Sequence, residues 1–150
     1  MVDREARDKA AEALRHFITG HMTNFKFEHE MPSSNDPVIA AVRDSIWPFY
    51  DDLSKHTLQG DWALPGETKA RMARWIMFLY TDEEYKWPGF PYAGVRPLRY
   101  GWLARLLGKP QKEQRFMGAG AYSLWPFFDP ASYNHAKQNP HLLAAEQSLE

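Results

Sequence analysis

The residues best suited to bind a ligand or a partner lie together in one segment, EYKWPGFPYAGVRPLRYGW, residues 84–102. Six aromatic residues stand there among three prolines and three glycines, together with two arginines. Aromatic faces beside guanidinium groups suit stacking on a nucleic-acid base, binding of an anion or contact with an acidic peptide. We therefore take six residues as candidate binding residues: Tyr85, Trp87, Phe90, Tyr92, Arg96 and Arg99.

The same segment also has a purely structural interpretation. Aromatic side chains pack inside proteins more often than they face solvent. On this alternative the segment is a loop that closes one end of a helical bundle, while its arginines extend to water. The sequence leaves both interpretations open, and the structural one is the more common outcome for such residues.

A second candidate site combines Trp47, Tyr50 and Asp51 with Trp87 and Arg96 in an aromatic pocket. Such a pocket would make the chain a small-molecule binder or an enzyme. The usual signatures of catalysis are missing from the sequence, however: it contains no Walker loop and no GxGxxG, HExxH or GxSxG motif. We therefore predict no catalytic residue and no cofactor, and we lean against an enzyme.

Carboxylate and imidazole groups recur at a spacing that suits two metal ligands. Glu12 and His16, like Asp52 and His56, are four residues apart, which puts each pair on one side of a helix. The same spacing is routine for surface charge pairs, and the chain has no cysteine that could supply a thiolate. We predict no metal site.

Charge is distributed unevenly along the chain. The net charge is −1, but residues 86–115 contain seven basic residues and one acid, whereas residues 1–85 contain ten basic and fifteen acidic residues. The basic window makes a weak nucleic-acid binder a further alternative. It is the less favoured one, because the isoelectric point is near 6.6 and no fold motif for nucleic-acid binding occurs.

These candidate residues must be positioned by helices, because the apolar pattern predicts helices and no useful strand. Proline marks several helix starts, and aspartate or asparagine precedes it at Asp36, Asp129 and Asn139. The predicted helices cover 4–19, 37 onward with a kink or break at Pro48, 66–81 and 97–107, and shorter ones cover 25–31, 110–117, 130–138 and 140–148. The predicted fold class is all-α: an irregular multi-helix bundle whose connections are rich in proline and aromatic residues.

Two of these helices carry specific predictions of burial. The helix that begins at Pro37 has an apolar stripe that continues to Leu53. In the helix over 97–107, the apolar residues fall on one face that we expect to turn inward: Leu98, Trp102, Leu103, Leu106 and Leu107.

A short repeat raises the question of a duplicated site. SIWPFYDD, residues 45–52, matches SLWPFFDP, residues 123–130, but the flanking residues disagree. We interpret both copies as packing devices, in which tryptophan and proline form a rigid apolar unit at a bend. We therefore expect both Trp47 and Trp125 to be buried. The bonds that precede Pro48, Pro88, Pro91 and Pro126 are candidates for cis geometry.

Size and composition indicate one ordinary domain, residues 1–150. Hydrophobic residues make up 44% and charged residues 25%, which is globular usage. The absence of cysteine favours a reducing compartment, and the charged N-terminal segment is unlike a secretory signal. The longest apolar run, 75–80, is too short to cross a bilayer. We therefore expect a cytoplasmic protein without membrane contact.

The runs DPVIAAVRDSIWPFYDD and RWIMFLYTDEEYKWP resemble a group of small, uncharacterised bacterial proteins, over about residues 1–90. The resemblance implies a bacterial, cytoplasmic, stand-alone domain and carries no activity. Together with the missing catalytic motifs, it leads to one functional hypothesis. The chain is a non-enzymatic binding protein that contacts a protein partner through segment 85–102, since aromatic residues and arginine are the types that dominate protein interfaces.

Overall fold

The computed structural model describes residues 1–96 and 98–139, and the regular secondary structure within them is all helical, which confirms the predicted all-α fold class. Seven α-helices and three short 3₁₀ turns are present in this part of the chain. Their bounds are α1 Arg4–Ile18, α2 Asn24–Glu30, α3 Pro37–Ile46, η1 Trp47–Phe49, η2 Gly60–Trp62, α4 Gly66–Leu79, α5 Trp102–Leu106, α6 Lys109–Met117, η3 Tyr122–Leu124 and α7 Pro130–Gln138.

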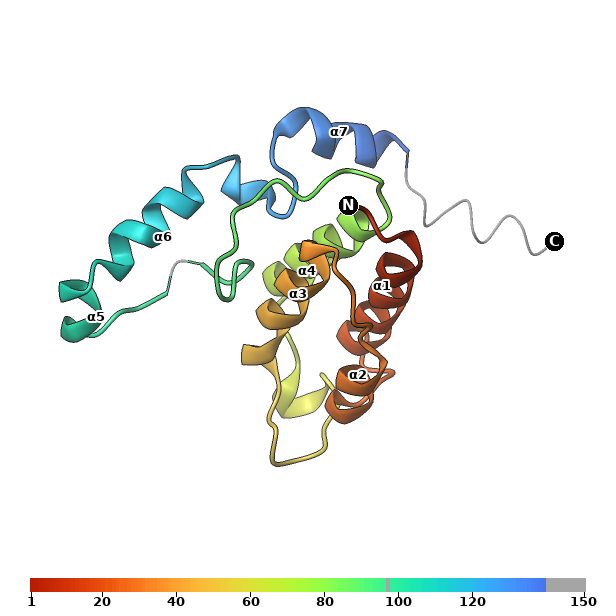
Figure 1. Cartoon of the computed structure of the whole chain (residues 1–150). Helices are drawn as coiled ribbons and strands as arrows, with labels where there is room; N and C mark the ends of the chain where they lie inside the picture. The colour runs from red at the N-terminus through yellow and green to blue at the C-terminus, as the bar shows by residue number, and fades with distance from the viewer. Residues whose placement is uncertain (97, 140–150) are drawn as a thin grey trace.

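Helices α1 to α4 form the body of the protein, and α6 and α5 extend away from it (Figure 1). Helix α1 packs on α4, α2 and α3, while α7 packs on α4. The buried face of α1 includes Ala10, Leu14 and Phe17, which follow the three- and four-residue spacing of an amphipathic helix. Helix α4 is apolar around most of its C-terminal half, as expected for a central helix, and it buries Trp75, Phe78 and Leu79 among others.

Helix starts follow the predicted capping chemistry where aspartate precedes proline. The Asp36 carboxylate accepts a hydrogen bond from the backbone N–H of Val38 at the start of α3. The Asp129 carboxylate does the same for Ser132 in α7. Each side chain satisfies a backbone donor that the first turn of a helix leaves unpaired. The start predicted at Pro140 lies outside the described residues, as does the helix predicted over 140–148.

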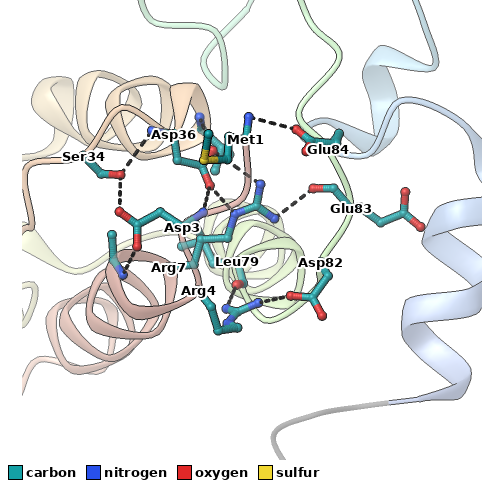
Figure 2. Close-up of polar contacts among 12 residues, drawn as sticks. Met1, Asp3, Arg4, Arg7, Ser34, Asp36, Leu79, Asp82, Glu83 and Glu84 are labelled. Carbon is teal, nitrogen blue, oxygen red and sulfur yellow. Dashed lines mark hydrogen bonds and ion pairs between the residues drawn. The ribbon is translucent and has the colours of Figure 1, made fainter.

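Two arginines of α1 hold the C-terminal end of α4 (Figure 2). Arg4 donates to the carbonyl of Leu79 and, at 2.8 Å, to that of Thr81. Arg7 donates to the carbonyls of Thr81 and Glu83, both at 2.9 Å. Since the last carbonyls of a helix have no partner within the helix, cations are favoured at this end. These contacts fix the place at which the chain leaves α4 and enters segment 84–102.

The predicted break at Pro48 is confirmed, whereas the buried stripe predicted up to Leu53 and the extent of the helix predicted over 97–107 are wrong. Helix α3 ends at Ile46, one residue before η1, because Pro48 cannot continue the helix. The expected stripe therefore stops short, and Leu53 is 93% exposed. The helix predicted over 97–107 is reduced to α5, Trp102–Leu106. Its expected inward face is exposed instead, because among the described residues α5 packs mainly on α6 and not on the helices of the body.

The repeated octapeptide serves two different purposes. Trp125 is 1% exposed, and its ring meets that of Trp75 edge to face at 5.4 Å between centroids, so the packing prediction is confirmed for this copy. Trp47 is 43% exposed, so the prediction is wrong for the first copy. Of the four candidate bonds, Trp125–Pro126 is cis.

The helices over 1–96 and 98–139 are short, the longest having 15 residues, and none of them combines the length and the apolar character of a transmembrane span.

Candidate functional site

The six candidate binding residues separate into buried and exposed groups. Trp87 is buried, with its indole N–H donating to the carbonyl of Pro126 at 3.0 Å and its ring against those of Phe116 and Phe128. Tyr85 is partly buried against Trp125, and its hydroxyl accepts from the indole N–H of that residue at 3.2 Å. Burial raises the pKa of Tyr85 to about 12. These two side chains fix the segment to the body and offer little surface to a partner.

Arg96 is also buried, where it joins α6 to the segment. Its Nη1 donates to a carboxylate oxygen of Glu113 and to the hydroxyl of Tyr100, each at 2.8 Å, and its guanidinium lies over the ring of Phe90 at 4.2 Å from the centroid. The other carboxylate oxygen of Glu113 accepts from the backbone N–H of Leu98 at 3.1 Å. Burial, followed by its hydrogen bond to Glu113, raises the pKa of Tyr100. Arg96 therefore holds α6 against the segment, with its guanidinium buried.

Phe116 completes the attachment of α6. Its ring is buried, stacked on Phe90 at 5.0 Å between centroids and tilted against Trp87 at 5.2 Å. The C-terminal half of α6 is thus held by Glu113 and Phe116, whereas the N-terminal half and all of α5 lie beyond these contacts (Figure 1).

The exposed part of this region is a contiguous stretch of large apolar side chains that we name the arm patch. Trp102 and Leu106 are each 74% exposed, and the other members are also solvent-facing. A cluster of this kind exceeds the scattered single apolar residues of an ordinary surface, and it makes this face a candidate interaction site. The arm patch comprises Leu98, Trp102, Leu103, Leu106 and Leu107.

Four basic side chains share two hollows with Leu98 of the arm patch. Arg99, Arg105, Lys109 and Lys112 are exposed, and within residues 1–96 and 98–139 none of the four forms an ion pair. An open hollow of about 740 Å³ brings the two kinds of side chain together, since Leu98, Arg99, Tyr100 and Arg105 all line it. Tyr92, 37% exposed, lies on a second hollow of about 350 Å³, with Lys109 and Lys112. The combination suits a partner with apolar and negative groups.

Trp47 and Tyr50 of the second candidate site contact each other, but neither lines a described hollow together with Arg96. Tyr50 packs against Phe17 and Phe27 in the body, and its ring lies 5.4 Å from that of Trp47. The carboxylate of Asp51 accepts from the backbone of Leu53 and the hydroxyl of Ser54, hydrogen bonds that lower its pKa. The two hollows lined by Arg96 contain none of Trp47, Tyr50 and Asp51.

The possible metal pairs are explained by other contacts. Glu12 and His16 lie 3.9 Å apart on α1 as a surface pair. His56 is not on a helix: its Nε2 accepts from the backbone N–H of Asp51, and its ring stacks on Trp62 at 3.8 Å. Across the described part of the chain, no group of three or more metal-binding side chains occurs.

Sequence reasoning did not single out Glu113 or the exposure of the arm patch. A signal for Glu113 exists, since it is the lone acid among seven basic residues of 86–115. For the arm patch the spacing shows that one face is apolar, but spacing alone does not show whether this chain covers that face.

No protein-family model matches the chain, and comparison with curated proteins and with solved structures finds no significant similarity. The resemblance of residues 1–90 to small bacterial proteins stays a prediction. What the site does must be argued from its own geometry.

Proposed function

We propose that the chain is a non-enzymatic binding protein that contacts an acidic protein partner through the arm patch and the four cations around it. The observation that carries the proposal is the exposure of Trp102, Leu103, Leu106 and Leu107 on a helix of five residues held outside the body. So short a helix is marginal without packing. A partner that covers its apolar face supplies the missing packing.

The basic side chains beside the arm patch indicate that the partner is acidic. The cations Arg99, Arg105, Lys109 and Lys112 lack carboxylate partners among the described residues, and the window 86–115 carries six net positive charges. An acidic surface steers toward such a patch and is held beside its apolar centre. A partner segment with carboxylates on both sides of an apolar stripe fits this arrangement best.

The contact residues proposed here lie nearer the C-terminal end of segment 85–102, and just beyond it, than those predicted from the sequence. Tyr92 and Arg99 remain contact residues, and the arm patch is added to them. Tyr85, Trp87, Phe90 and Arg96 support the surface from below. The lack of cysteine supports the cytoplasm as the compartment in which the contact forms.

The test compares affinity purifications with four forms of the protein as bait. The first variant, Trp102→Ala with Leu106→Ala, removes the apolar centre, and the second, Arg105→Glu with Lys112→Glu, reverses two charges. Leu53→Ala is the matched control for the first, because Leu53 is an exposed leucine outside the arm. We expect an acidic protein that wild type and Leu53→Ala retain and both arm variants lose.

Direct titration of that protein then measures the effect. Loss of a central tryptophan should weaken binding by about 30-fold, which corresponds to about 2 kcal/mol, and added salt should weaken it further. The proposal fails if all four baits retain the same proteins. It also fails if the material lost by the arm variants is released by nuclease, or if Trp102→Ala abolishes self-association, since nucleic acid or a second copy would then be the occupant.

A further inference from the structure

A cavity of about 340 Å³ lies beside α4, and its lining residues differ from those of the arm patch. Arg71, Arg74 and Trp75 of α4 form one wall, and Arg96, Tyr122 and Trp125 contribute the others. None of the arm-patch residues lines it. The cavity is therefore a separate site, and its volume is at the lower end of those that hold small molecules.

Arg74 supplies a cation to the lining of this cavity. Its Nε donates to the carbonyl of Trp125 at 2.9 Å, and it has no carboxylate partner among the described residues. Burial, and then repulsion from Arg71, lowers the pKa of Arg74. A partly buried guanidinium with a neighbouring guanidinium is stabilised by an anion placed between or beside them.

The negative groups nearby do not fill this role. Glu67 lies 3.8 Å from Arg71, but its side chain is 89% exposed, so the pair is weakened by solvent. Glu113 is committed to Arg96 on the buried side. The lining thus keeps a positive excess at Arg71 and Arg74.

Two residues that line the cavity also carry a buried donor without a partner among the described residues. The indole Nε1 of Trp75 and the Nε of Arg96 make no hydrogen bond within the described residues. Buried donors are almost always paired in native proteins, so each unpaired donor marks a place where a partner belongs. Both atoms are covered from solvent, so the oxyanion proposed below is assigned to Arg71 and Arg74 and not to these two donors.

The walls between the charges are aromatic. The rings of Trp75 and Trp125 stand edge to face, and Tyr122 lies on the same cavity. Gly94 lets the backbone lie close against the two indoles, because a Cβ at that position would lie 2.5 Å from the ring of Trp75. We propose that this cavity binds a small organic oxyanion, a carboxylate or a phosphate carried on an aromatic ring, with Arg71 and Arg74 holding the oxyanion.

Isothermal titration with simple probes tests the proposal. Benzoate and phenyl phosphate carry the two oxyanions on one ring, and benzamide is their uncharged counterpart. We expect saturable binding of at least one anion with a Kd below about 1 mM and much weaker binding of benzamide. Arg74→Gln and Arg71→Gln should each weaken anion binding by about tenfold or more, since each removes a charge-assisted hydrogen bond.

Arg43→Gln is the control, because Arg43 is an exposed arginine of α3 that does not line the cavity. Its binding should equal that of wild type. Circular dichroism shows whether each variant is folded, and Arg71→Gln keeps the test decisive if Arg74→Gln does not fold, since Arg71 has only a weak, exposed pair to lose. Absence of saturable binding, equal binding of benzamide, or equal loss in Arg43→Gln would each overturn the proposal. None of these results bears on the arm patch.

Discussion

At the scale of single residues, Arg7 illustrates how one side chain joins three parts of the fold. It forms a buried ion pair with Asp36 at 2.7 Å and donates to the two carbonyls that follow α4. Arg7→Met should lower the free energy of unfolding by about 3–5 kcal/mol, because it leaves the carboxylate of Asp36 buried without its cation. Urea unfolding measures the change.

The control for this prediction is Lys9→Met on the same helix. Lys9 pairs with Glu5 at 2.6 Å, but both side chains are largely exposed, and surface pairs add little. We expect no measurable change in the urea midpoint. Equal losses in the two variants would show that burial does not distinguish the pairs.

Gly94 supplies a second test at this scale. A methyl group there would lie 2.5 Å from Trp75, 2.7 Å from Trp125 and 3.0 Å from the hydroxyl of Ser45. Gly94→Ala should therefore cost about 1–3 kcal/mol through overpacking. At Gly89 nothing lies within 4 Å of the added Cβ, so Gly89→Ala should be neutral in the same urea experiment. A neutral Gly94→Ala would mean that the two tryptophans are free to move apart.

At the scale of elements, the tryptophans of the two octapeptide copies should contribute different amounts to the free energy of unfolding. Trp125 is enclosed and Trp47 is 43% exposed, so Trp125→Ala should cost about 3–5 kcal/mol and Trp47→Ala about 1 kcal/mol. Denaturant unfolding of both variants measures the difference. Equal costs would restore the view that both copies are packing devices.

The sequence predicts the elements well where local chemistry decides them. Aspartate before proline placed the starts of α3 and α7, and the apolar spacing placed α1 and α4, because capping and amphipathic period are local properties. The exposure of the arm patch could not be predicted in this way. Whether Leu103 and Leu106 are covered depends on which helices approach them, and that is a tertiary property.

The candidate site was predictable in composition but not in orientation. The segment 85–102 does hold exposed Tyr92 and Arg99. However, Arg96 turns inward because Glu113, 17 residues later, supplies a buried carboxylate, and Trp87 turns inward to reach the carbonyl of Pro126. Neither contact can be predicted from the spacing of the residues within segment 85–102.

At the scale of the whole molecule, the buried tyrosines predict a loss of stability in alkali. Burial raises the pKa of Tyr85 from 10.0 to about 12 in the folded state. A raised pKa stabilises the fold below the unfolded value, and that stability is lost as pH rises from about 10 through about 12. The free energy of unfolding should fall across this window by up to about 2–3 kcal/mol from this residue.

Urea unfolding at pH values on both sides of this window measures the loss. Tyr85→Phe should make the free energy of unfolding fall less steeply with pH, because the ring stays while the ionising hydroxyl is removed. An unchanged slope in Tyr85→Phe would assign the alkaline loss to other groups. The variant should also be less stable near neutral pH, since the indole N–H of Trp125 loses its acceptor.

The hydrogen bonds between Arg7 of α1 and the carbonyls that follow α4 also bear on when this part of the fold can form during synthesis. Arg7 donates to the carbonyls of two residues that lie 74 and 76 positions later in the sequence. Synthesis therefore produces α1 well before the residues that pair with Arg7. The contacts between α1 and the end of α4 can form only after Glu83 has been added, so the body of α1 to α4 is complete only at that stage.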